Sequence, residues 1–363
     1  MLLILLAVIT LLQVGYYGFF FRIFAYANPP VKTDFQPPVS ILISCKNEAD
    51  HLDQLIPVLL AQDYPNFELV LINDHSTDAT AEIIQKFAQA DTRIKSVNIP
   101  TTPISKGNKK QALAYGISLA SHEYLLFTDA DCKPVTSHWI SEMAQAFLPH
   151  QSIVLGYGTY EKHPTFLNDL IRYETLLTAW QYFSYAMRGL PYMGVGRNLA
   201  YTQTLFKNNK GFEAHQHILS GDDDLMVSQN AKATQVASVW QQPAHTVSVP
   251  KTTWTAWFRQ KRRHITTSHH YKPLIKLLLG LFYLTQIGFY TLFLTVLFFQ
   301  PFSFLIIFIV LLRFIAYYYT LIPVARKLNE TDLVWKAPLL ECLLILMQGI
   351  IFISNLIRKP KYW

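Results

Sequence analysis

Glu123-Tyr-Leu-Leu-Phe-Thr-Asp-Ala-Asp-Cys-Lys-Pro134 contains the change of pattern from which the architecture of the chain can be predicted. Its first half, residues 124–128, is a short apolar run ending in a β-branched residue, which is typical of a buried strand. The run stops at two carboxylates, Asp129 and Asp131, so both lie where a strand ends and a loop begins. Ligands bind at this edge of an open α/β sheet, and two acidic groups one residue apart repel each other unless they share a cation. The pattern predicts a divalent metal ion that holds a diphosphate, and the alternative is a solvated Asp-x-Asp turn.

Strand and helix patterns alternate before this stretch. The expected strands are 39–44, 68–73 and a weaker one near 94–99, and the expected helices are about 50–61, 79–88 and 109–119. Repeated βαβ units with short connections predict an α/β fold with a parallel, doubly wound sheet. Such a sheet has a crevice large enough for a nucleotide.

Acidic residues recur at the ends of these predicted strands. Glu48 follows the first strand, Asp74 follows the second, and Asp129 and Asp131 follow the last. One such residue can serve as a helix cap, which is the simpler interpretation of Asp78. Because the carboxyl ends of parallel strands meet at one edge of a sheet, four such residues indicate a shared binding site there.

Composition divides the chain into a soluble part and membrane segments. Of 363 residues, 51% are hydrophobic and 15% are charged, and the mean hydropathy is +0.19, which is too apolar for an ordinary soluble protein. The net charge of +7 fits the positive-inside bias of a membrane protein better than nucleic-acid binding, because no basic run is interleaved with exposed aromatics. Cys45, Cys132 and Cys342 show no metal-ligand spacing, so we expect a reducing cytoplasmic compartment without disulfides.

Four apolar stretches are near or above the length that crosses a bilayer, and the first spans residues 2 to about 21. No basic region precedes it and no small-x-small cleavage site follows it, so we expect a retained anchor instead of a signal peptide. Arg22 and Lys32 then place the following residues in the cytoplasm by the positive-inside rule. The other apolar stretches are about 277–299, 302–323 and 339–357.

The basic residues around the last stretches conflict with one another. Arg326 and Lys327 mark a return to the cytoplasm, and a full crossing after them would put Arg358, Lys359 and Lys361 outside. Either one segment is re-entrant or interfacial, or the positive-inside rule fails for this tail, and the sequence leaves both open.

The predicted domains are an N-terminal transmembrane helix at 1–26, a cytoplasmic domain at 38–270 and a C-terminal region of about three apolar helices at 274–357.

The acidic strand ends belong to a longer series of motifs. The series is Ser44-Cys-Lys-Asn-Glu48, Asn73-Asp-His-Ser-Thr-Asp78, Ser105-Lys-Gly-Asn-Lys-Lys-Gln-Ala-Leu113, Asp129-Ala-Asp131, Tyr192-Met-Gly-Val-Gly-Arg-Asn-Leu-Ala-Tyr201, Ser220-Gly-Asp-Asp-Asp-Leu225 and Arg259-Gln-Lys-Arg-Arg-His264. In these motifs, the chain from residue 39 to about 264 resembles the membrane-bound glycosyltransferases of family 2. The relatives of that family include the synthases of cellulose, chitin, hyaluronan and poly-N-acetylglucosamine. The resemblance implies the GT-A fold of nucleotide-diphospho-sugar transferases, with N- and C-terminal transmembrane helices. It also implies an integral protein of a bacterial inner membrane with a cytoplasmic catalytic domain.

The first two motifs resemble the nucleotide site of the family. Glu48 matches the Asn-Glu turn that lies against the nucleotide, and Asp74 matches the carboxylate that contacts the uracil ring. His75 replaces the usual glycine. The resemblance therefore implies a nucleotide diphosphate-sugar donor, with UDP-sugars ahead of the others.

The next two motifs resemble the diphosphate site. The stretch from Ser105 is similar to Lys-x-Gly-Asn-x-x-x-Ala-Leu, which puts Lys106 beside the diphosphate, although one residue is missing between Lys106 and Gly107. Asp129 and Asp131 match the metal-binding triplet, which implies Mg²⁺ or Mn²⁺ as the cofactor. Either ion would neutralise the leaving diphosphate as its bond to the sugar breaks.

The three carboxylates at 222–224 supply the candidate base. The acceptor hydroxyl must lose a proton as it attacks the anomeric carbon, and a carboxylate is the base of the family for that step. Aligning the family pattern on Asp224 and Leu225 puts Asp222 in the base position, with Gly221 replacing the usual Glu, whereas sliding by one residue nominates Asp223. Crowding should raise at least one pKa, although a solvated helix N-terminus has the same sequence pattern.

Two further motifs resemble the acceptor and leaving-group sides of the family site. Gly194 and Gly196 match a Gly-x-Gly strand that faces the acceptor, where a sugar or lipid head group can approach the backbone. Gln260 and Arg263 match a Gln-x-x-Arg-Trp signature, in which the Arg can stabilise the leaving diphosphate. His264 stands where the family has a Trp near the acceptor, which weakens the inference of a long polymer. The alternative for this motif is a basic cluster beside the membrane.

Residues 157–188 contain an aromatic-rich helical pattern, which is either an amphipathic helix at the lipid interface or a core helix.

For the whole chain we expect an inverting, metal-dependent glycosyltransferase, because one base and one displacement invert the anomeric carbon. The expected acceptor is a lipid, a lipid-linked sugar or a glycan. The alternatives are a processive polysaccharide synthase, a catalytically silent membrane scaffold and a transporter, which is disfavoured because the apolar stretches carry few charges besides Arg313 and Glu341.

Overall fold

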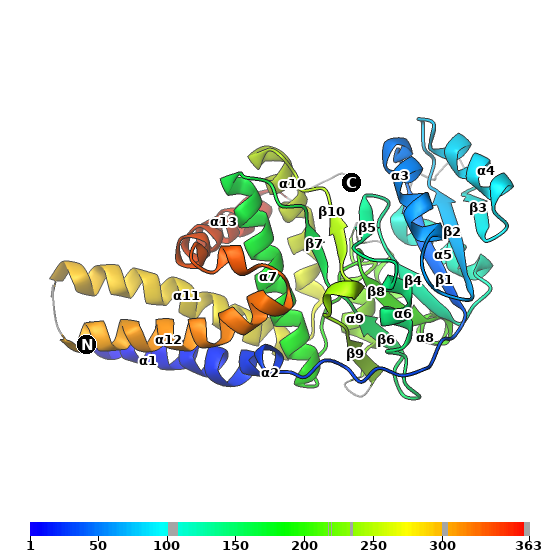
Figure 1. Cartoon of the computed structure of the whole chain (residues 1–363). Helices are drawn as coiled ribbons and strands as arrows, with labels where there is room; N and C mark the ends of the chain where they lie inside the picture. Colours follow the sequence, from blue (N-terminus) through cyan, green and yellow to red (C-terminus); the bar gives the residue numbers. More distant parts are fainter. Residues whose placement is uncertain (101–107, 217, 219, 233–234, 300–303, 359–363) are drawn as a thin grey trace. The chain divides into compact units, whose positions relative to one another are not determined.

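The structure is a computed structural model that describes residues 1–100, 108–216, 218, 220–232, 235–299 and 304–358 (Figure 1). The chain divides into two compact units, each with its own core. The helical unit comprises Met1–Asn28, Lys162–Leu190 and Lys251–Lys361. The sheet unit comprises Pro29–Glu161 and Pro191–Pro250. The domain boundaries expected from the sequence stay a prediction.

A seven-stranded sheet, in the order β3-β2-β1-β4-β8-β6-β9, forms the centre of the sheet unit. Its strands are β1 (Val39–Cys45), β2 (Phe67–Asn73), β3 (Ile94–Asn98), β4 (Tyr124–Phe127), β6 (Ile153–Leu155), β8 (Leu199–Thr202) and β9 (Val236–Ser238). β1 pairs in parallel with β2 and β4, and β2 pairs in parallel with β3, whereas β8 runs antiparallel to β4 and β6. The predicted mostly parallel sheet is confirmed.

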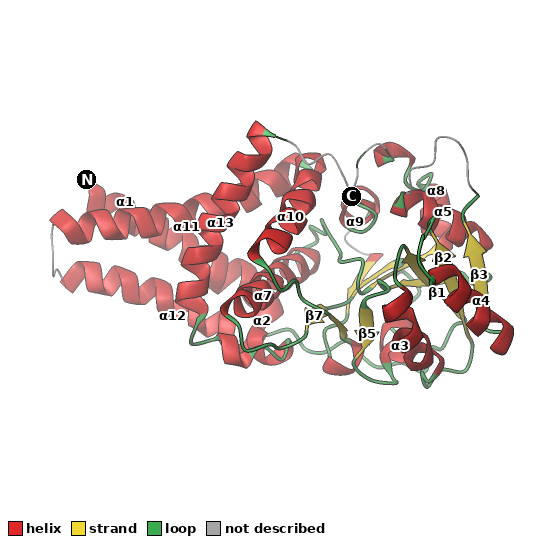
Figure 2. Ribbon diagram, turned by 90° about the horizontal axis from the view of Figure 1, so that it is seen from above, coloured by secondary structure: helices red, strands yellow, loops and turns green. Residues whose placement is uncertain are grey.

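Helices cover both faces of this sheet (Figure 2). They are α3 (Ala49–Leu60), α4 (Thr80–Ala90), α5 (Lys109–Leu119), α6 (Trp139–Ala144), α8 (Gln203–Asn208) and α9 (Asp224–Asn230), with 3-10 turns η2 (Glu213–His215) and η4 (Gln242–Ala244). α3, α4 and α6 share one buried core with the face of β1 that carries Ile41. α5 packs against the sheet so closely that a Cβ added at Gly116 would lie 2.2 Å from Ile72. α5 has its predicted ends, and the Asn108 side chain caps it by accepting from the Lys110 N–H at 3.0 Å.

A smaller three-stranded sheet, in the order β5-β10-β7, follows the acidic stretch. It consists of β5 (Cys132–Pro134), β7 (Gly158–Tyr160) and β10 (Thr246–Ser248). On β10, Val247 pairs with Lys133 on one side and with Thr159 on the other, so the strand joins segments that are far apart in sequence. This sheet fixes the chain immediately after Asp131.

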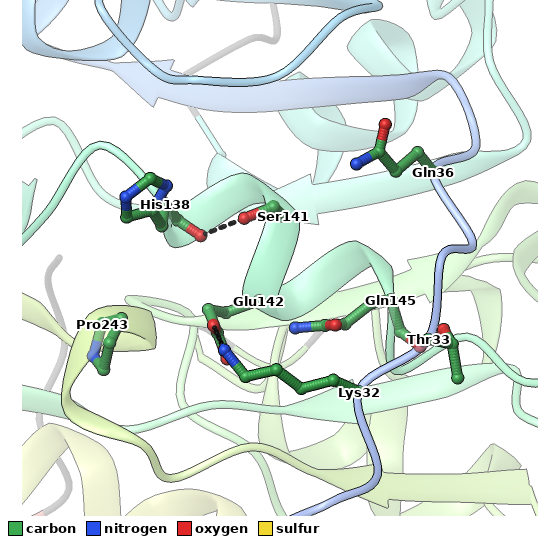
Figure 3. A pocket seen from close by; sticks show the side chains of 8 residues that line it. All are labelled: Lys32, Thr33, Gln36, His138, Ser141, Glu142, Gln145 and Pro243. Carbon is green, nitrogen blue, oxygen red and sulfur yellow. Dashed lines mark hydrogen bonds and ion pairs between the residues drawn. The ribbon is translucent and has the colours of Figure 1, made fainter.

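The segment that precedes β1 runs along α6 (Figure 3). Lys32 Nζ pairs with Glu142 Oε1 at 2.7 Å, and the Thr33 hydroxyl donates to the Gln145 carbonyl oxygen at 3.1 Å. A cavity of about 340 Å³ lies here and is lined by Lys32, Thr33, Gln36, His138, Ser141, Glu142, Gln145 and Pro243. None of the acidic strand-end residues lines this cavity. Its contacts instead hold the segment against α6.

Within the described residues, four helices of the helical unit are long and apolar enough to cross a membrane. The first runs through α1 (Leu2–Gly15), a π-helical turn η1 (Tyr16–Phe21) and α2 (Arg22–Ala25), and the others are α11 (Pro273–Phe299), α12 (Phe304–Lys327) and α13 (Ala337–Ile357). α7 (Phe166–Met187), α10 (Trp254–His264) and the 3-10 turns η5 (Ile265–His270) and η6 (Thr331–Leu333) also belong to this unit. The four apolar helices coincide with the four predicted apolar stretches.

α7 is a core helix of the helical unit. Sixteen of its 22 residues are buried, and the Trp180 ring packs against the rings of Tyr17 and Phe21. Its one buried arginine, Arg172, pairs with acidic residues just after α12, with Asp332 Oδ1 at 2.7 Å. Burial on nearly every side favours the core alternative over a helix lying on a lipid surface.

A buried ion pair ties the apolar helices together. Arg313 on α12 pairs with Glu341 on α13 at 2.7 Å, and both side chains are at most 1% exposed. Side chains from α1, η1 and α11 complete the hydrogen bonds of the pair, and they are Gln13, Tyr17, Gln286 and Tyr290. The pair is therefore fully bonded, which removes the main cost of burying two charges.

Candidate functional site

The carboxyl ends of β1 and β2 meet at Asp74. This residue is 4% exposed, and its backbone N–H donates to the Cys45 carbonyl oxygen at 2.8 Å. Asp74 Oδ1 lies 2.9 Å from His75 Nδ1. His75 has a φ of +58°, which is the left-handed conformation that glycine adopts most easily. The loop thus has the backbone shape for which the resembled motif uses a glycine, although the residue differs.

Glu48 lies directly after β1, on the same edge of the sheet. Its Oε2 lies 2.6 Å from His51 Nδ1, and its backbone N–H donates to the Thr80 hydroxyl at 2.8 Å. Burial raises the pKa of Glu48, the hydrogen bond with His51 lowers it, and the charges of Asp131 and Asp129 raise it. The acidic residues predicted at the ends of β1 and β4 are therefore within electrostatic reach of one another.

Asp129, Asp131 and Cys132 place their potential ligand atoms within 4.8 Å of one another. Cys132 Sγ lies 3.2 Å from Asp131 Oδ1 and 2.8 Å from Ser248 Oγ. Burial raises the pKa of the Cys132 thiol well above its usual range, and the charges of Asp131 and Asp129 add to this effect, so a metal ion would have to displace a tightly held proton to use this sulfur as a ligand. The remaining donors are carboxylate oxygens, which suit a hard ion such as Mg²⁺ or Mn²⁺.

Lys109, in the first turn of α5, connects the candidate metal-binding residue Asp129 with the acidic run at 222–224. Its Nζ lies 2.7 Å from Asp129 Oδ1 and 3.0 Å from Asp222 Oδ2. Burial alone would lower the pKa of Lys109, but Asp129, Asp222 and Asp223 raise it well above its usual range. In the sequence, Lys109 marks only the start of a predicted helix, and its place after the Lys-Gly-Asn motif is the one hint of a ligand role. Lys106, predicted beside the diphosphate, lies outside the described residues.

Asp223 holds the loop that carries Asp222. Asp223 Oδ2 accepts a hydrogen bond from the Gly196 N–H and Oδ1 accepts one from the Asp224 N–H, both at 2.7 Å. Burial raises the pKa of Asp223 to about 7, and the charges of Asp222 and Asp224 contribute in the same direction. A Cβ at Gly196 would lie 3.3 Å from Asp223 Oδ2. Glycine at this position therefore permits the close contact between the two segments.

A small cavity of about 10 Å³ lies between these segments, with room for about one water molecule. Lys109, Asp129, Gly196, Asp222 and Asp223 contribute to its wall. Tyr201 on β8 also lines it, and the buried hydroxyl of this residue has no hydrogen-bond partner among the described residues. The cavity thus brings both acidic clusters and a polar hydroxyl to one point of the sheet unit.

Gly194, the other glycine of the predicted acceptor motif, is surrounded by core side chains. A Cβ at this position would lie 2.9 Å from Leu199, 3.2 Å from Leu155 and 3.3 Å from Val227. Packing alone therefore explains why the residue is a glycine. The predicted contact of Gly194 with an acceptor stays a prediction.

Arg197 is a second cation near the metal triplet, and no motif in the sequence singled it out. Its Nη1 donates to the Thr159 carbonyl oxygen at 3.2 Å, and its guanidinium lies 4.3 Å from the centre of the Tyr160 ring. Burial alone would lower the pKa of Arg197, but Tyr160 and the acidic groups of Asp129 and Asp131 help to raise it. Arg197 directly follows the Gly-x-Gly motif, which is the only signal that could have identified it.

Gln260, Arg263 and His264 lie on α10 of the helical unit, whereas the acidic residues belong to the sheet unit. Their predicted roles at the diphosphate and the acceptor stay predictions. The neighbouring Lys261 pairs with Glu174 on α7 at 2.7 Å. This lysine therefore joins two helices of one unit.

Part of the chain matches a known family model. Residues 40–205 match the model described as Glycosyl transferase family 2. The matched segment begins at the second residue of β1 and includes β2, β3, β4, β6 and β8 together with all the candidate donor residues, and it ends before the acidic run at 222–224.

Two relatives in sequence carry the same name. Over 93 residues the chain is 38% identical to the poly-beta-1,6-N-acetyl-D-glucosamine synthase of Staphylococcus epidermidis, which is 26% of this chain and 21% of that protein. Over 118 residues it is 32% identical to the poly-beta-1,6-N-acetyl-D-glucosamine synthase of Staphylococcus aureus, which is 32% of this chain and 27% of that protein. The match therefore spans only about a fifth to a quarter of the length of these curated relatives.

A solved structure is similar over most of the chain. It is the mannosyltransferase PcManGT from Pyrobaculum calidifontis in complex with GDP-Man and Mn²⁺. The TM-score is 0.53 at 16% sequence identity, over 93% of this chain and 99% of that chain. A likeness at this identity shows the fold alone, which is the predicted GT-A-like α/β fold.

Proposed function

We propose that this chain, a glycosyltransferase with a family 2 domain, moves a sugar from a nucleotide diphosphate-sugar to an acceptor at the membrane with inversion of configuration. The observation that carries the proposal is the pair of contacts made by Lys109 Nζ, 2.7 Å to Asp129 and 3.0 Å to Asp222. They bring one candidate metal carboxylate and the candidate base to the same ammonium group. Donor and acceptor would then meet beside this lysine.

The donor is proposed to bind at the carboxyl ends of β1, β2 and β4. Buried Asp74 would accept a hydrogen bond from the base of the nucleotide, and the Glu48 turn would lie against the nucleotide. A Mg²⁺ or Mn²⁺ ion held by Asp131 and Asp129 would neutralise the leaving diphosphate. A UDP-sugar is the first candidate, because Asp74 stands at the uracil-reading position of the resembled motif.

Asp222 is proposed as the base. The proton of the acceptor hydroxyl passes to its carboxylate as the acceptor oxygen attacks the anomeric carbon, and the bond from that carbon to the diphosphate oxygen breaks. Both oxygens of Asp223 already accept backbone hydrogen bonds at 2.7 Å, which favours Asp222. Asp223 is the alternative, since its raised pKa of about 7 would also suit a base.

The acceptor is proposed to be a lipid, a lipid-linked sugar or a glycan, because the helical unit contains four helices that could cross a membrane. Gly196 and His264 are proposed to face it, and Arg263 with Gln260 to stabilise the leaving diphosphate. A processive polysaccharide synthase is the second candidate. The names of the two staphylococcal relatives favour it.

The test is nucleotide release by the purified, detergent-solubilised protein, screened with UDP-, GDP- and dTDP-sugars, with Mg²⁺ or Mn²⁺ and a total lipid extract. We expect metal-dependent release with one donor, and mass spectrometry of the products then separates a single transfer from polymer synthesis. Asp131→Asn should abolish release, and Asp63→Asn, an exposed carboxylate of the same unit, is the matched control. No release and no metal-dependent nucleotide binding would instead favour a silent scaffold.

A further inference from the structure

α13 lies across the other apolar helices instead of running beside them. α1 packs along both α11 and α12. In Figure 1 α13 is seen nearly end on while α1, α11 and α12 are seen from the side, and in Figure 2 it crosses their direction. Three long apolar helices that run together define the direction in which this unit crosses a bilayer. A helix that lies across them therefore runs along the membrane.

Both ends of α13 are attached to α7 and α10. At its start, Lys336 Nζ lies 2.8 Å from Asp169 Oδ2 in the first turn of α7. At its end, Asn355 Oδ1 accepts from Arg262 Nε and Asn355 Nδ2 donates to the Arg262 carbonyl oxygen, both at 2.8 Å. α7 and α10 are themselves joined by the ion pair between Lys261 and Glu174. The two ends of α13 therefore lie on the same side of the helical unit.

The surface of α13 suits lipid. Its one charged residue, Glu341, is bonded to Arg313 and is 1% exposed. The exposed side chains along the helix are apolar, and they include Leu339, Leu346, Ile350, Ile353, Leu356 and Ile357. Trp335, just before the helix, is 87% exposed, and tryptophan is enriched at the boundary between lipid and water.

We propose that α13 lies in the lipid leaflet next to α7 and α10 and does not cross the membrane. The chain then crosses three times, through α1, α11 and α12, and residue 358 lies on the same side as residues 329–336. This arrangement removes the conflict among the basic residues, because Arg22, Arg326, Lys327 and Arg358 all fall on one side. It also means that the Arg262–Asn355 contact holds α10 at the membrane surface.

Cysteine labelling in intact cells tests the topology. Cys342→Ser provides the background, since Cys45 and Cys132 are fully buried. Thr331→Cys, Arg358→Cys and Phe304→Cys, all at exposed positions, are treated with a membrane-impermeant maleimide before and after permeabilisation. We expect the first two variants to react alike and Phe304→Cys to react in the opposite way. Reaction of Arg358→Cys together with Phe304→Cys would overturn the proposal.

A second measurement decides the outcome if the variants label weakly. A fluorescent protein is fused after residue 363 in one version of the chain, and alkaline phosphatase is fused there in another. The first is fluorescent only in the cytoplasm, and the second is active only outside it. With Thr331 assigned to the cytoplasm by its labelling, we expect fluorescence without phosphatase activity. Phosphatase activity without fluorescence would show that α13 crosses the membrane. Neither readout depends on sugar transfer, so the topology is tested independently of the proposed function.

Discussion

The partly buried Lys109 of the sheet unit and the buried Arg313 of the helical unit differ in the number of carboxylates that surround them. Arg313 faces one carboxylate, Glu341, and bonds both of its oxygens at 2.7 Å. Lys109 faces Asp129 at 2.7 Å and Asp222 at 3.0 Å, and the charge of Asp223 acts on it as well. The pair of Arg313 and Glu341 carries no net charge and has its hydrogen bonds made. The group around Lys109 has more carboxylates than cations, so it keeps surplus negative charge. A complete pair fixes packing, and surplus negative charge in a cavity attracts a cationic ligand.

Asp222→Asn should show the largest effect, because it removes the proposed base from the group with surplus charge. We expect turnover to fall by about 10²–10⁴-fold with little change in the melting temperature. Nucleotide release by the purified protein measures the loss. Asp63→Asn should keep full turnover. Full turnover in Asp222→Asn would contradict its assignment as the base.

Arg313→Met should break the complete pair and leave Glu341 buried without its cation. The expected loss of stability is about 3–5 kcal/mol, seen as a lower melting temperature in detergent, with unchanged turnover per folded molecule. The double variant with Glu341→Gln should regain much of this loss, because the unpaired charge is gone. A double variant as unstable as the single one would contradict the pairing argument.

Lys109→Gln sharpens the comparison, because it leaves Asp129 and Asp222 to repel each other. Loss of a charge-assisted hydrogen bond should lower turnover by roughly 10–100-fold. Mn²⁺ should raise the melting temperature of this variant more than that of the wild type, since a divalent ion supplies the missing positive charge. Arg313→Met, which leaves Asp129 and Asp131 unchanged, serves as the control and should gain no more from Mn²⁺ than the wild type does. Equal gains in both variants would argue against an ion site at Asp129.

Asp223→Asn should give the smallest effect, a change in the pH dependence. Burial, Asp222 and Asp224 raise the pKa of Asp223 to about 7, so in the wild type the acidic run gains a proton as the pH falls through about 7. Turnover should therefore rise with pH across this value. The variant lacks the carboxylate that takes up this proton, so its turnover should no longer rise with pH near 7. An unchanged rise near pH 7 in the variant would contradict the assignment to Asp223.

Local pattern was sufficient for much of the fold and part of the site. The aliphatic runs that form β1 and β2 predict buried parallel strands, and the pattern of residues 109–119 predicts α5. Because parallel strands end at one edge, the electrostatic proximity of Glu48 to Asp129 and Asp131 also followed from the sequence. None of these inferences needed contacts between distant residues.

The parts that could not be predicted depend on such contacts. Lys109 reaches Asp222 on a loop formed much later in the chain, and no spacing within the sequence records that pairing. β5, β7 and β10 have three residues each, which is too short to show a periodic pattern. The direction of α13 is set by residues at its two ends, whereas its apolar composition equally allows a crossing helix.

The pairing of Gln13 with Arg313 has a consequence for synthesis of the protein. The two residues are 300 positions apart in the chain, so α1 leaves the ribosome long before its partner helix exists. At a synthesis rate of about 5–20 residues per second, Arg313 is made roughly 15–60 s after Gln13. The packing of the helical unit is therefore complete only after α12 has been made, although α1 precedes the whole sheet unit in the chain. A chain cut short before Arg313 would leave Gln13 without this partner, although α1 would still have α11 to pack against.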